Sequence, residues 1–257
     1  MFQHNFPKEK IMRIDGRAAD QLREVKITPN YLRFAEGSVM IEWGKNKVLC
    51  AATIEQRVPP HLIGSGQGWV TAEYAMLPRS AKQRIQRDTG RGKPNARGIE
   101  IQRLIGRALR AIVNLSAFGE RSILIDCDVI ESDGGTRTAS ITGSFVALAL
   151  AIERMREDQL VGKNAVILKD YLAAVSVGVV EGKPVLDLNY LEDSAAETDM
   201  NVVLTGAGSF VEIQGTAEKH PFTEAEFQAM MQLARKGAAE VVAIQKSIVD
   251  IRKGIVA

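Results

Sequence analysis

Short, largely apolar segments bounded by turn residues recur along the chain, which is the pattern of strands. Residues 38–43 and residues 47–54 are two such segments on either side of the turn Gly44-Lys45-Asn46, so they predict a hairpin. Residues 122–130 place apolar side chains on one face of a strand and acidic side chains on the other. Further strands are expected at residues 172–180, 185–190, 200–204 and 210–214.

Other segments repeat their apolar residues at helical spacing. Residues 101–115 carry an amphipathic stripe, whereas residues 139–155 are apolar almost all round and predict the most buried helix. Thr223 and Glu226 form a capping box, so a long helix is expected from there towards Lys253. Strands in hairpins with helices packed on them predict an α+β (mixed α/β) fold.

The domain organisation follows from the absence of a linker or an internal repeat in the sequence. Residues 12–257 are expected to form one domain, and residues 1–11 are interpreted as a native extension or a cloning remnant outside it. The same eleven residues lack the basic start and apolar centre of a signal peptide. No apolar run reaches the roughly 18 residues of a membrane helix, so no membrane association is expected.

Cysteine and histidine usage argues against a zinc protein. Cys50 and Cys127 lie far apart in apolar segments and are interpreted as buried thiols in a reducing cytoplasm. The sequence has no CxxC pair and no cysteine–histidine cluster. The three histidines are scattered, which favours surface positions over a catalytic base.

Charge is segregated along the chain, although the net charge is only +2. Between Arg79 and Arg97 there are seven basic residues and one acid, and between Asp187 and Asp199 there are five acids and no base. Such segregation is typical of a protein that binds a polyanion in one place and a cation in another. A solvated loop and a solvated turn would give the same pattern, so charge alone leaves both interpretations open.

The segment before the buried helix reads Ser-Asp-Gly-Gly-Thr-Arg-Thr-Ala-Ser and is the first candidate for chemistry. Gly134 and Gly135 let backbone N–H groups approach an anion, and the start of the helix directs further N–H groups to the same place. Thr136 adds a hydroxyl, and Arg137 adds a guanidinium suited to phosphate. Arg97 could form the other side of a phosphate clamp. The alternatives are an ordinary glycine turn with a threonine cap and a surface arginine.

Asp187 and Asp193 are the second candidate for chemistry. Asp187 lies on a predicted strand and Asp193 in the turn after it. The two carboxylates could therefore converge on one Mg²⁺ ion, or one of them could protonate a leaving oxygen. Acids of an ordinary hairpin turn are the alternative.

Four motifs, in this order, resemble the ribonuclease PH family, and the similarity extends from about Arg13 to about Ile248. The motifs are Gly-Gln-Gly-Trp-Val-Thr-Ala-Glu-Tyr-Ala-Met-Leu-Pro-Arg-Ser (residues 66–80), Ile-Glu-Ile-Gln-Arg-Leu-Ile-Gly-Arg (99–107), Leu-Ile-Asp-Cys-Asp-Val-Ile followed by Gly-Gly-Thr-Arg-Thr-Ala-Ser (124–140), and Glu-Asp-Ser-Ala-Ala-Glu-Thr-Asp-Met-Asn (192–201).

The resemblance implies an RNase PH-like fold of the ribosomal protein S5 domain 2-like type. It implies a tRNA nucleotidyltransferase, that is, a phosphorolytic 3′→5′ exoribonuclease that trims the 3′ end of tRNA precursors. Inorganic phosphate would be the co-substrate, nucleoside diphosphates the products, and the reaction reversible. Other RNA 3′ ends, rRNA included, are further candidate substrates. A homohexamer built as a trimer of dimers, a cytoplasmic location and a Mg²⁺ cofactor are also implied.

The family's functional residues fall on nine positions of this chain. The resemblance implies phosphate binding by Arg97, Gly135, Thr136 and Arg137. It implies that the catalytic and metal-binding aspartates are Asp187 and Asp193, and that the RNA-binding arginines are Arg79, Arg84 and Arg87. Two other functions stay open: a hydrolytic, metal-dependent nuclease that uses water, and a non-catalytic RNA-binding subunit of a ring.

Overall fold

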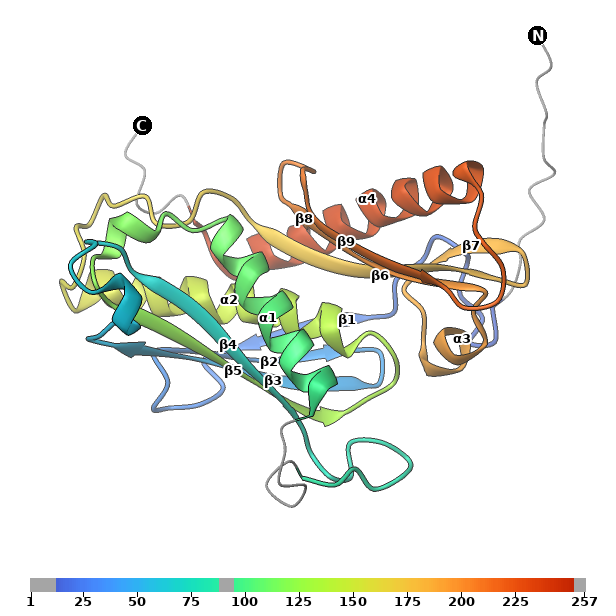
Figure 1. The fold of residues 1–257 in the computed structure, drawn as a ribbon, viewed down its shortest axis with the longest axis horizontal. Coiled ribbons are helices and arrows are strands. Elements are labelled where there is room, and N and C mark those ends of the chain that lie inside the picture. The colour runs from blue at the N-terminus through green and yellow to red at the C-terminus, as the bar shows by residue number, and fades with distance from the viewer. Residues whose placement is uncertain (1–12, 88–94, 252–257) are drawn as a thin grey trace, which may run out of the picture.

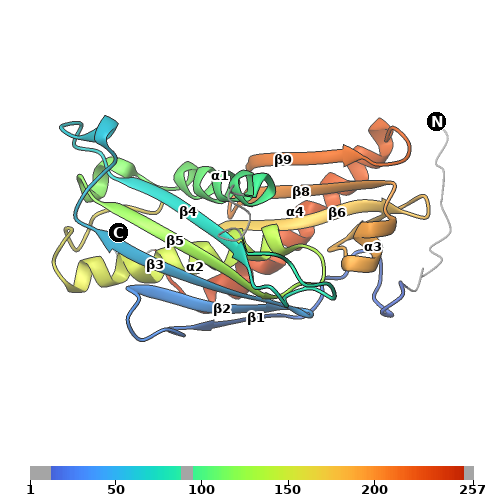
Figure 2. The same cartoon turned by 60° about the horizontal axis from the view of Figure 1, so that its bottom comes forward.

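The first of two sheets has five strands in the order β1-β2-β3-β5-β4 (Figures 1 and 2). The computed structural model describes residues 13–87 and 95–251. Neighbouring strands are antiparallel except β4 and β5, which run parallel because α1 (Ala96–Ala111) returns the chain between them. The strands are β1 (Val25–Pro29), β2 (Gly37–Trp43), β3 (Asn46–Glu55), β4 (Trp69–Met76) and β5 (Ser122–Glu131).

The second sheet has four antiparallel strands in the order β7-β6-β8-β9. The central strand β6 is buried along nearly its whole length, as its run of alanine and valine requires. A short helix, α3 (Tyr190–Ala195), leads from β7 into β8. The strands are β6 (Leu172–Val180), β7 (Lys183–Leu186), β8 (Thr198–Thr205) and β9 (Phe210–Ala217).

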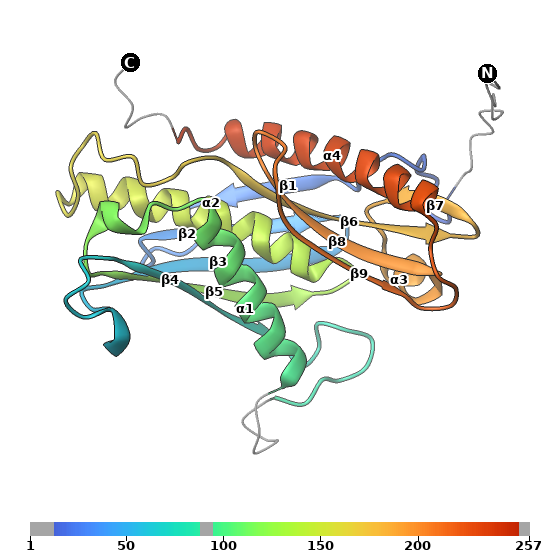
Figure 3. The ribbon, with the colours of Figure 1, turned by 45° about the horizontal axis from the view of Figure 1, so that its top comes forward.

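Helix α2 (Thr136–Glu157) joins the two sheets, because it packs on β2 and β3 of one and on β6 of the other (Figure 3). Contact on both sides explains why its sequence is apolar almost all round. Helix α4 (Glu224–Lys246) packs on β6 and β7, and α1 packs on β4. One hydrophobic core contains buried residues of both sheets and of these three helices.

Most of the predicted elements are confirmed. The hairpin at residues 38–54 is β2 and β3, and the strand at residues 122–130 is β5, with its alternate apolar residues buried. The nearly all-round apolar helix is α2, which starts at Thr136. The capping box is present, since the Thr223 hydroxyl accepts from Glu226 N and the Glu226 carboxylate accepts from Thr223 N.

Three predicted boundaries are wrong. The strand expected at residues 185–190 ends at Leu186, because the chain turns at Asp187 and begins α3 after the Asn189 cap. The amphipathic helix starts at Ala96 and ends at Ala111, so Leu115 lies in a separate 3₁₀ turn. Helix α4 ends at Lys246. Residues 1–11 lie outside the described residues, and no helix among those described is long and apolar enough to cross a membrane.

Gly37 shows how closely β2 approaches α2 and provides a test of this packing. A Cβ at Gly37 would lie 2.1 Å from the Ala147 carbonyl oxygen and 2.6 Å from the Ala151 nitrogen. Both atoms are helix backbone and cannot move aside as a side chain would. We expect Gly37→Ala to lower the free energy of unfolding by about 1–3 kcal/mol, measured by urea denaturation.

Gly162→Ala is the matched control, because open space surrounds the position of its Cβ. It should change the free energy of unfolding by less than about 0.5 kcal/mol. An equal loss in both variants would contradict the close packing of β2 on α2.

Candidate active site

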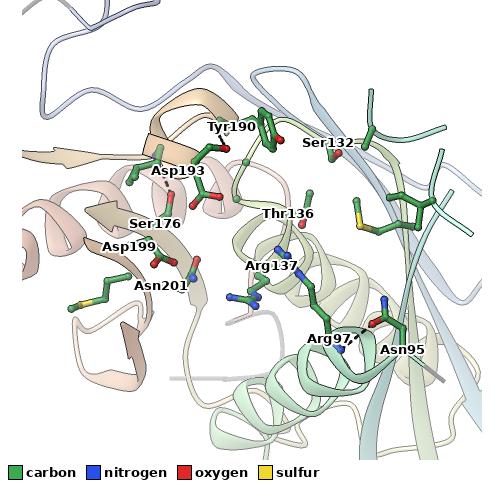
Figure 4. Close-up of a pocket in the computed structure, with 18 residues that line it drawn as sticks. Asn95, Arg97, Ser132, Thr136, Arg137, Ser176, Tyr190, Asp193, Asp199 and Asn201 are labelled. Carbon is green, nitrogen blue, oxygen red and sulfur yellow. Dashed lines mark hydrogen bonds between the residues drawn. The ribbon is translucent and has the colours of Figure 1, made fainter. Parts of the chain in front are cut away.

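A pocket of about 480 Å³ opens where the N-terminal ends of α1 and α2 meet α3 and β8 (Figure 4). Its lining includes Arg97, Thr136, Arg137, Asp193 and Asp199. The basic and acidic segments, which lie about a hundred residues apart in the chain, therefore meet in one place. Of the residues predicted to act on phosphate, the pocket brings together all four, and it also contains Asp193.

The turn between β5 and α2 forms one wall of the pocket. Gly134 and Gly135 both have a φ of 75°, a left-handed conformation that favours glycine. A Cβ on Gly134 would lie 2.7 Å from the backbone of Asn189 and of Tyr190, so the turn packs directly on the acidic segment. Because α2 begins at Thr136, the first N–H groups of the helix have no intrahelical acceptor. The turn therefore combines two glycines with free N–H groups at the start of a helix, which are the features of anion-binding turns.

Arg137 extends from the first turn of α2 into the pocket (Figure 4). Its Nη2 donates to Glu100 Oε2 at 3.1 Å, and Glu100 Oε1 accepts from Gln214 Nε2 at 2.8 Å. Its Nε is buried without a hydrogen-bond partner among the described residues. A buried donor without a partner costs about 1–3 kcal/mol, so the Arg137 Nε is a free donor for a water molecule or an anion.

Arg97 approaches the same space from the first turn of α1. Asn95 caps this helix, since its Oδ1 accepts from Arg97 N at 3.1 Å. The side chain is exposed, lines the pocket, and lies close enough to Asp193 to lower the pKa of that carboxyl. Arg97 and Arg137 thus lie side by side in the lining of the pocket (Figure 4).

Asp193 and Asp199 form the acidic side of the pocket. Asp193 is an exposed residue of α3, yet its carboxyl points inward among protein atoms (Figure 4). Desolvation and the charge of Asp199 raise the pKa of Asp193 above its ordinary value, against the lowering effect of Arg97 and Arg137. A carboxyl with a raised pKa is suited to donating a proton to a leaving oxygen.

Asp187 does not meet Asp193 in the pocket, and this corrects the sequence prediction. Its backbone has a φ of 58°, which turns the side chain inward at the end of β7. The carboxylate accepts from Arg23 N at 2.7 Å, from Arg23 Nη2 at 2.7 Å, from Arg17 Nη1 at 3.2 Å and from Trp43 Nε1 at 3.0 Å. Burial would raise the pKa of Asp187, but these arginines outweigh it and hold the pKa low.

No local pattern in the sequence points to the arginines around Asp187, although the similarity to the family extends to Arg13. Arg13 pairs with Glu192 of α3 and donates to the Leu186 carbonyl at 2.5 Å. Three arginines and two acids pair with one another here, and we call them the buried ion cluster: Arg13, Arg17, Arg23, Asp187 and Glu192. The cluster joins the N-terminal segment to α3, which carries Asp193.

Tyr74 of β4 holds Thr136 at the start of α2. The Tyr74 hydroxyl and Thr136 Oγ1 are 2.9 Å apart. Burial raises the pKa of Tyr74, so the phenol stays protonated at neutral pH. No local pattern in the sequence links these two side chains, because they lie 62 residues apart.

The loop after β4 borders the pocket on its open side. The three arginines predicted to bind RNA are exposed here: Arg79, Arg84 and Arg87. Arg84 shares an adjoining cavity with Tyr190, and Arg87 shares another with Arg97. The basic residues at positions 91 and 93 lie outside the described residues. The positive charges of Arg84 and Arg87 therefore lie next to the pocket.

The acidic side offers oxygen ligands of the kind that Mg²⁺ prefers. Asp193, Asp199 and Asn201 line the pocket with carboxylate and amide oxygens. No group of three or more His, Cys, Asp or Glu side chains that could hold a metal occurs in the part of the chain that the structure describes. Mg²⁺ usually keeps several waters and takes one or two carboxylates plus substrate phosphate, so these residues fit it.

Two family models match the chain. Residues 21–152 match “3′ exoribonuclease family, domain 1” and residues 170–237 match “3′ exoribonuclease family, domain 2”. The chain is also 56% identical over 236 residues to the ribonuclease PH of Bacillus cereus (strain G9842), and equally identical to that of Bacillus anthracis. These matches cover 91% of this chain and 96% of each relative.

Solved structures share the fold at low sequence identity. Rice (Oryza sativa) Rrp46 matches with a TM-score of 0.74 and 18% identity, over 91% of this chain and 99% of that one. An Archaeoglobus fulgidus exosome chain, solved with RNA bound to the active site, matches with a TM-score of 0.76 and 22% identity. That match covers 90% of this chain and 91% of the other. The predicted RNase PH-like fold is confirmed.

Asp199→Asn tests the coupling of the two acids. We expect it to lower the pKa of Asp193, because it removes the negative charge that opposes ionisation. Because the pKa of Asp193 is higher in the folded protein than in the unfolded chain, the free energy of unfolding falls as the pH rises from 3.8 through the raised pKa. This fall should be smaller in Asp199→Asn. The measurement is a ¹³C NMR titration of the Asp193 carboxyl.

Glu157→Gln, at the far end of α2, removes the same charge outside the pocket and should leave the Asp193 titration unchanged. An Asp193 pKa that is the same in Asp199→Asn and in the unmodified protein would contradict the coupling.

Proposed function

The chain belongs to the 3′ exoribonuclease family that includes ribonuclease PH, and on this basis we propose how its residues trim the 3′ end of tRNA precursors. The reaction is phosphorolysis in the 3′→5′ direction, with inorganic phosphate as co-substrate. It releases one nucleoside diphosphate per cycle, and in reverse the enzyme is a tRNA nucleotidyltransferase. The observation that best supports the site assignment is the buried, unpartnered Nε of Arg137 beside the Gly134–Gly135 turn.

The attacking phosphate binds at the basic side of the pocket. Arg97 and Arg137 neutralise its charge, while the N–H groups around Gly135 and the hydroxyl of Thr136 orient it. A phosphate oxygen then attacks the phosphorus of the last phosphodiester. The two arginines offset the repulsion between two anions, so catalysis here is by positioning and charge neutralisation.

The leaving group departs on the acidic side of the pocket. As the phosphorus–oxygen bond to the penultimate ribose breaks, its 3′ oxygen takes up a proton, and Asp193 is the group whose raised pKa suits that step. In the alternative route Asp193 is ionised and donates no proton, and Asp193 and Asp199, rather than Asp187, are the carboxylates that would hold Mg²⁺. When bound, the ion would supply charge neutralisation at the leaving oxygen.

The RNA is held outside the pocket by the loop after β4. Arg79, Arg84 and Arg87 are exposed, and Arg84 and Arg87 border cavities that adjoin the pocket. Contacts of this kind are made to the phosphate backbone and are independent of sequence. They suit an enzyme that removes different nucleotides in turn, including nucleotides of rRNA.

Assembly and location complete the proposal. The likeness to ribonuclease PH is our basis for proposing a homohexamer built as a trimer of dimers, in which exposed apolar side chains such as Phe34, at 83% exposure, would be available for subunit contacts. The core shared by both sheets supports a single domain over residues 12–257. Cys50 and Cys127 are free and buried, which supports a reducing, cytoplasmic location.

Phosphate dependence tests this function. With a tRNA precursor and inorganic phosphate, we expect shortened RNA and nucleoside diphosphates, resolved by chromatography. Without phosphate, shortening should stop, since the nucleophile is absent. A hydrolytic nuclease would instead continue and release nucleoside monophosphates, and a non-catalytic ring subunit would shorten nothing under either condition.

Arg137→Ala tests the proposed phosphate site in the same assay. Loss of a preorganised donor to the reacting phosphate should lower the rate of phosphorolysis about 100-fold or more. Arg154→Ala, an exposed arginine at the other end of α2, should retain the full rate. Equal rates in the two variants would remove Arg137 from the phosphate site.

RNA binding by the loop after β4 can be tested separately. Replacing Arg79, Arg84 and Arg87 with alanine should weaken binding of a tRNA precursor more than cleavage of a short oligonucleotide. The slope of log K against log salt should fall by about 2–3, because three phosphate contacts are lost. The control triple variant replaces Arg33, Arg57 and Arg154, which are exposed away from the pocket. If precursor binding and oligonucleotide cleavage fell by the same factor, this role for the loop would be excluded.

A further inference from the structure

The back of the Gly134–Gly135 turn is held by a residue that does not line the pocket. We propose that Arg23 is a positioning residue of the phosphate site: it fixes the carbonyls of Asp133 and Gly134 so that the N–H groups of the turn face the attacking phosphate. This inference rests on the proposed function, because it assigns Arg23 a role in binding the phosphate of that reaction.

Four hydrogen bonds hold the turn from behind. Arg23 Nη1 donates to the Asp133 carbonyl at 2.6 Å, and Arg23 Nη2 donates to the Gly134 carbonyl at 3.2 Å. Asn46 Nδ2 donates to the same Gly134 carbonyl at 2.5 Å, while Asn46 Oδ1 accepts from Asp133 N at 2.6 Å. Both side chains are buried, and neither lines the pocket.

The orientation of the N–H groups follows from peptide geometry. In a trans peptide the carbonyl and the following N–H point in opposite directions, and the structure has no cis peptide bond among its described residues. Because the Gly134 carbonyl points to Arg23 and Asn46, the Gly135 N–H points away from them. The Asp133 carbonyl orients the Gly134 N–H in the same way. The Arg23 and Asn46 donors behind the turn therefore determine that N–H groups, and not carbonyl oxygens, face the anion.

Two consecutive glycines make this anchoring necessary. Glycine adopts positive and negative φ with nearly equal ease, so a Gly-Gly turn can rotate its central peptide at little steric cost. A rotated peptide would present the Gly134 carbonyl oxygen, a partial negative charge, to the phosphate. The hydrogen bonds from Arg23 and Asn46 oppose that rotation.

The anchor needs an arginine, and Asp187 explains how it is oriented. Asp187 Oδ1 accepts from Arg23 Nη2 at 2.7 Å, and Asp187 Oδ2 accepts from Arg23 Nε at 3.1 Å. The planar guanidinium thus has one edge on the carboxylate, while Nη1 and Nη2 also reach the two carbonyls. A lysine keeps the charge opposite Asp187 but has no planar fork that spans these acceptors.

Arg23→Lys tests the inference in the full-length protein. We expect the KM for inorganic phosphate to rise about tenfold or more, the size of one lost charge-assisted hydrogen bond. The KM for the RNA should stay within about twofold, because the exposed loop arginines are untouched. Inhibition by sulfate, an unreactive stand-in for phosphate, should weaken in the same proportion.

Arg13→Lys is the matched control. Arg13 belongs to the same buried ion cluster, but it contacts Glu192 and the carbonyls of Gln21, Leu186 and Asp187 and does not touch the turn. A purely structural role for the cluster predicts similar changes in melting temperature and in phosphate KM for both variants. The positioning role predicts that only Arg23→Lys shifts the phosphate KM and sulfate inhibition.

Asn46→Asp provides a second variant in case Arg23→Lys does not fold. It keeps the acceptor for Asp133 N and removes the donor to the Gly134 carbonyl, so it should also raise the phosphate KM selectively. A phosphate KM unchanged in a folded Arg23→Lys or Asn46→Asp protein, or raised equally in Arg13→Lys, overturns the inference. Failure of the unmodified enzyme to use phosphate would refute the proposed function itself, which separates the two results.

Discussion

The pairing of Asp187 with Arg23 is the interaction on which the two sides of the pocket depend. Arg23 reaches from the N-terminal segment to the carbonyls of the anion-binding turn, and Asp187 orients it from the end of β7. Glu192, bound by Arg13, continues the same buried ion cluster into α3, next to Asp193. One network therefore contacts both the turn that we propose binds the attacking phosphate and the helix that carries the proposed acid, Asp193.

Burying this much charge makes the cluster sensitive to the loss of any single member. Removing ions from water costs several kcal/mol each, and only complete pairing and hydrogen bonding offset that cost. Asp187 shows this balance, because burial would raise the pKa of its carboxyl while Arg23 and Arg17 hold the pKa low. Asp193 shows the opposite balance, since its pocket and Asp199 raise its pKa. The same residue type thus has a lowered pKa in one position and a raised pKa in the other.

Local sequence patterns predicted the elements, the anion turn and one acid, but not the contacts between distant segments. Apolar segments on either side of a turn predicted β2 and β3, alternation predicted β5, and the all-round apolar pattern predicted α2, because these patterns reflect burial of neighbouring residues. The pairing of Asp187 with Asp193 was wrong, since the positive φ of Asp187 and an arginine 164 residues away direct its carboxylate inward. Asp199 was within the quoted acidic run, yet only the strand β8 places it opposite Asp193.

The most direct test of the account is a crystal structure of the enzyme with inorganic phosphate bound. We expect a phosphate oxygen within hydrogen-bond distance of the Gly135 nitrogen and of the guanidinium groups of Arg97 and Arg137. We also expect the Gly134 carbonyl to remain hydrogen-bonded to Arg23, with its oxygen turned away from the ligand. A phosphate held by side chains alone, with the Gly134 carbonyl released from Arg23, would contradict it.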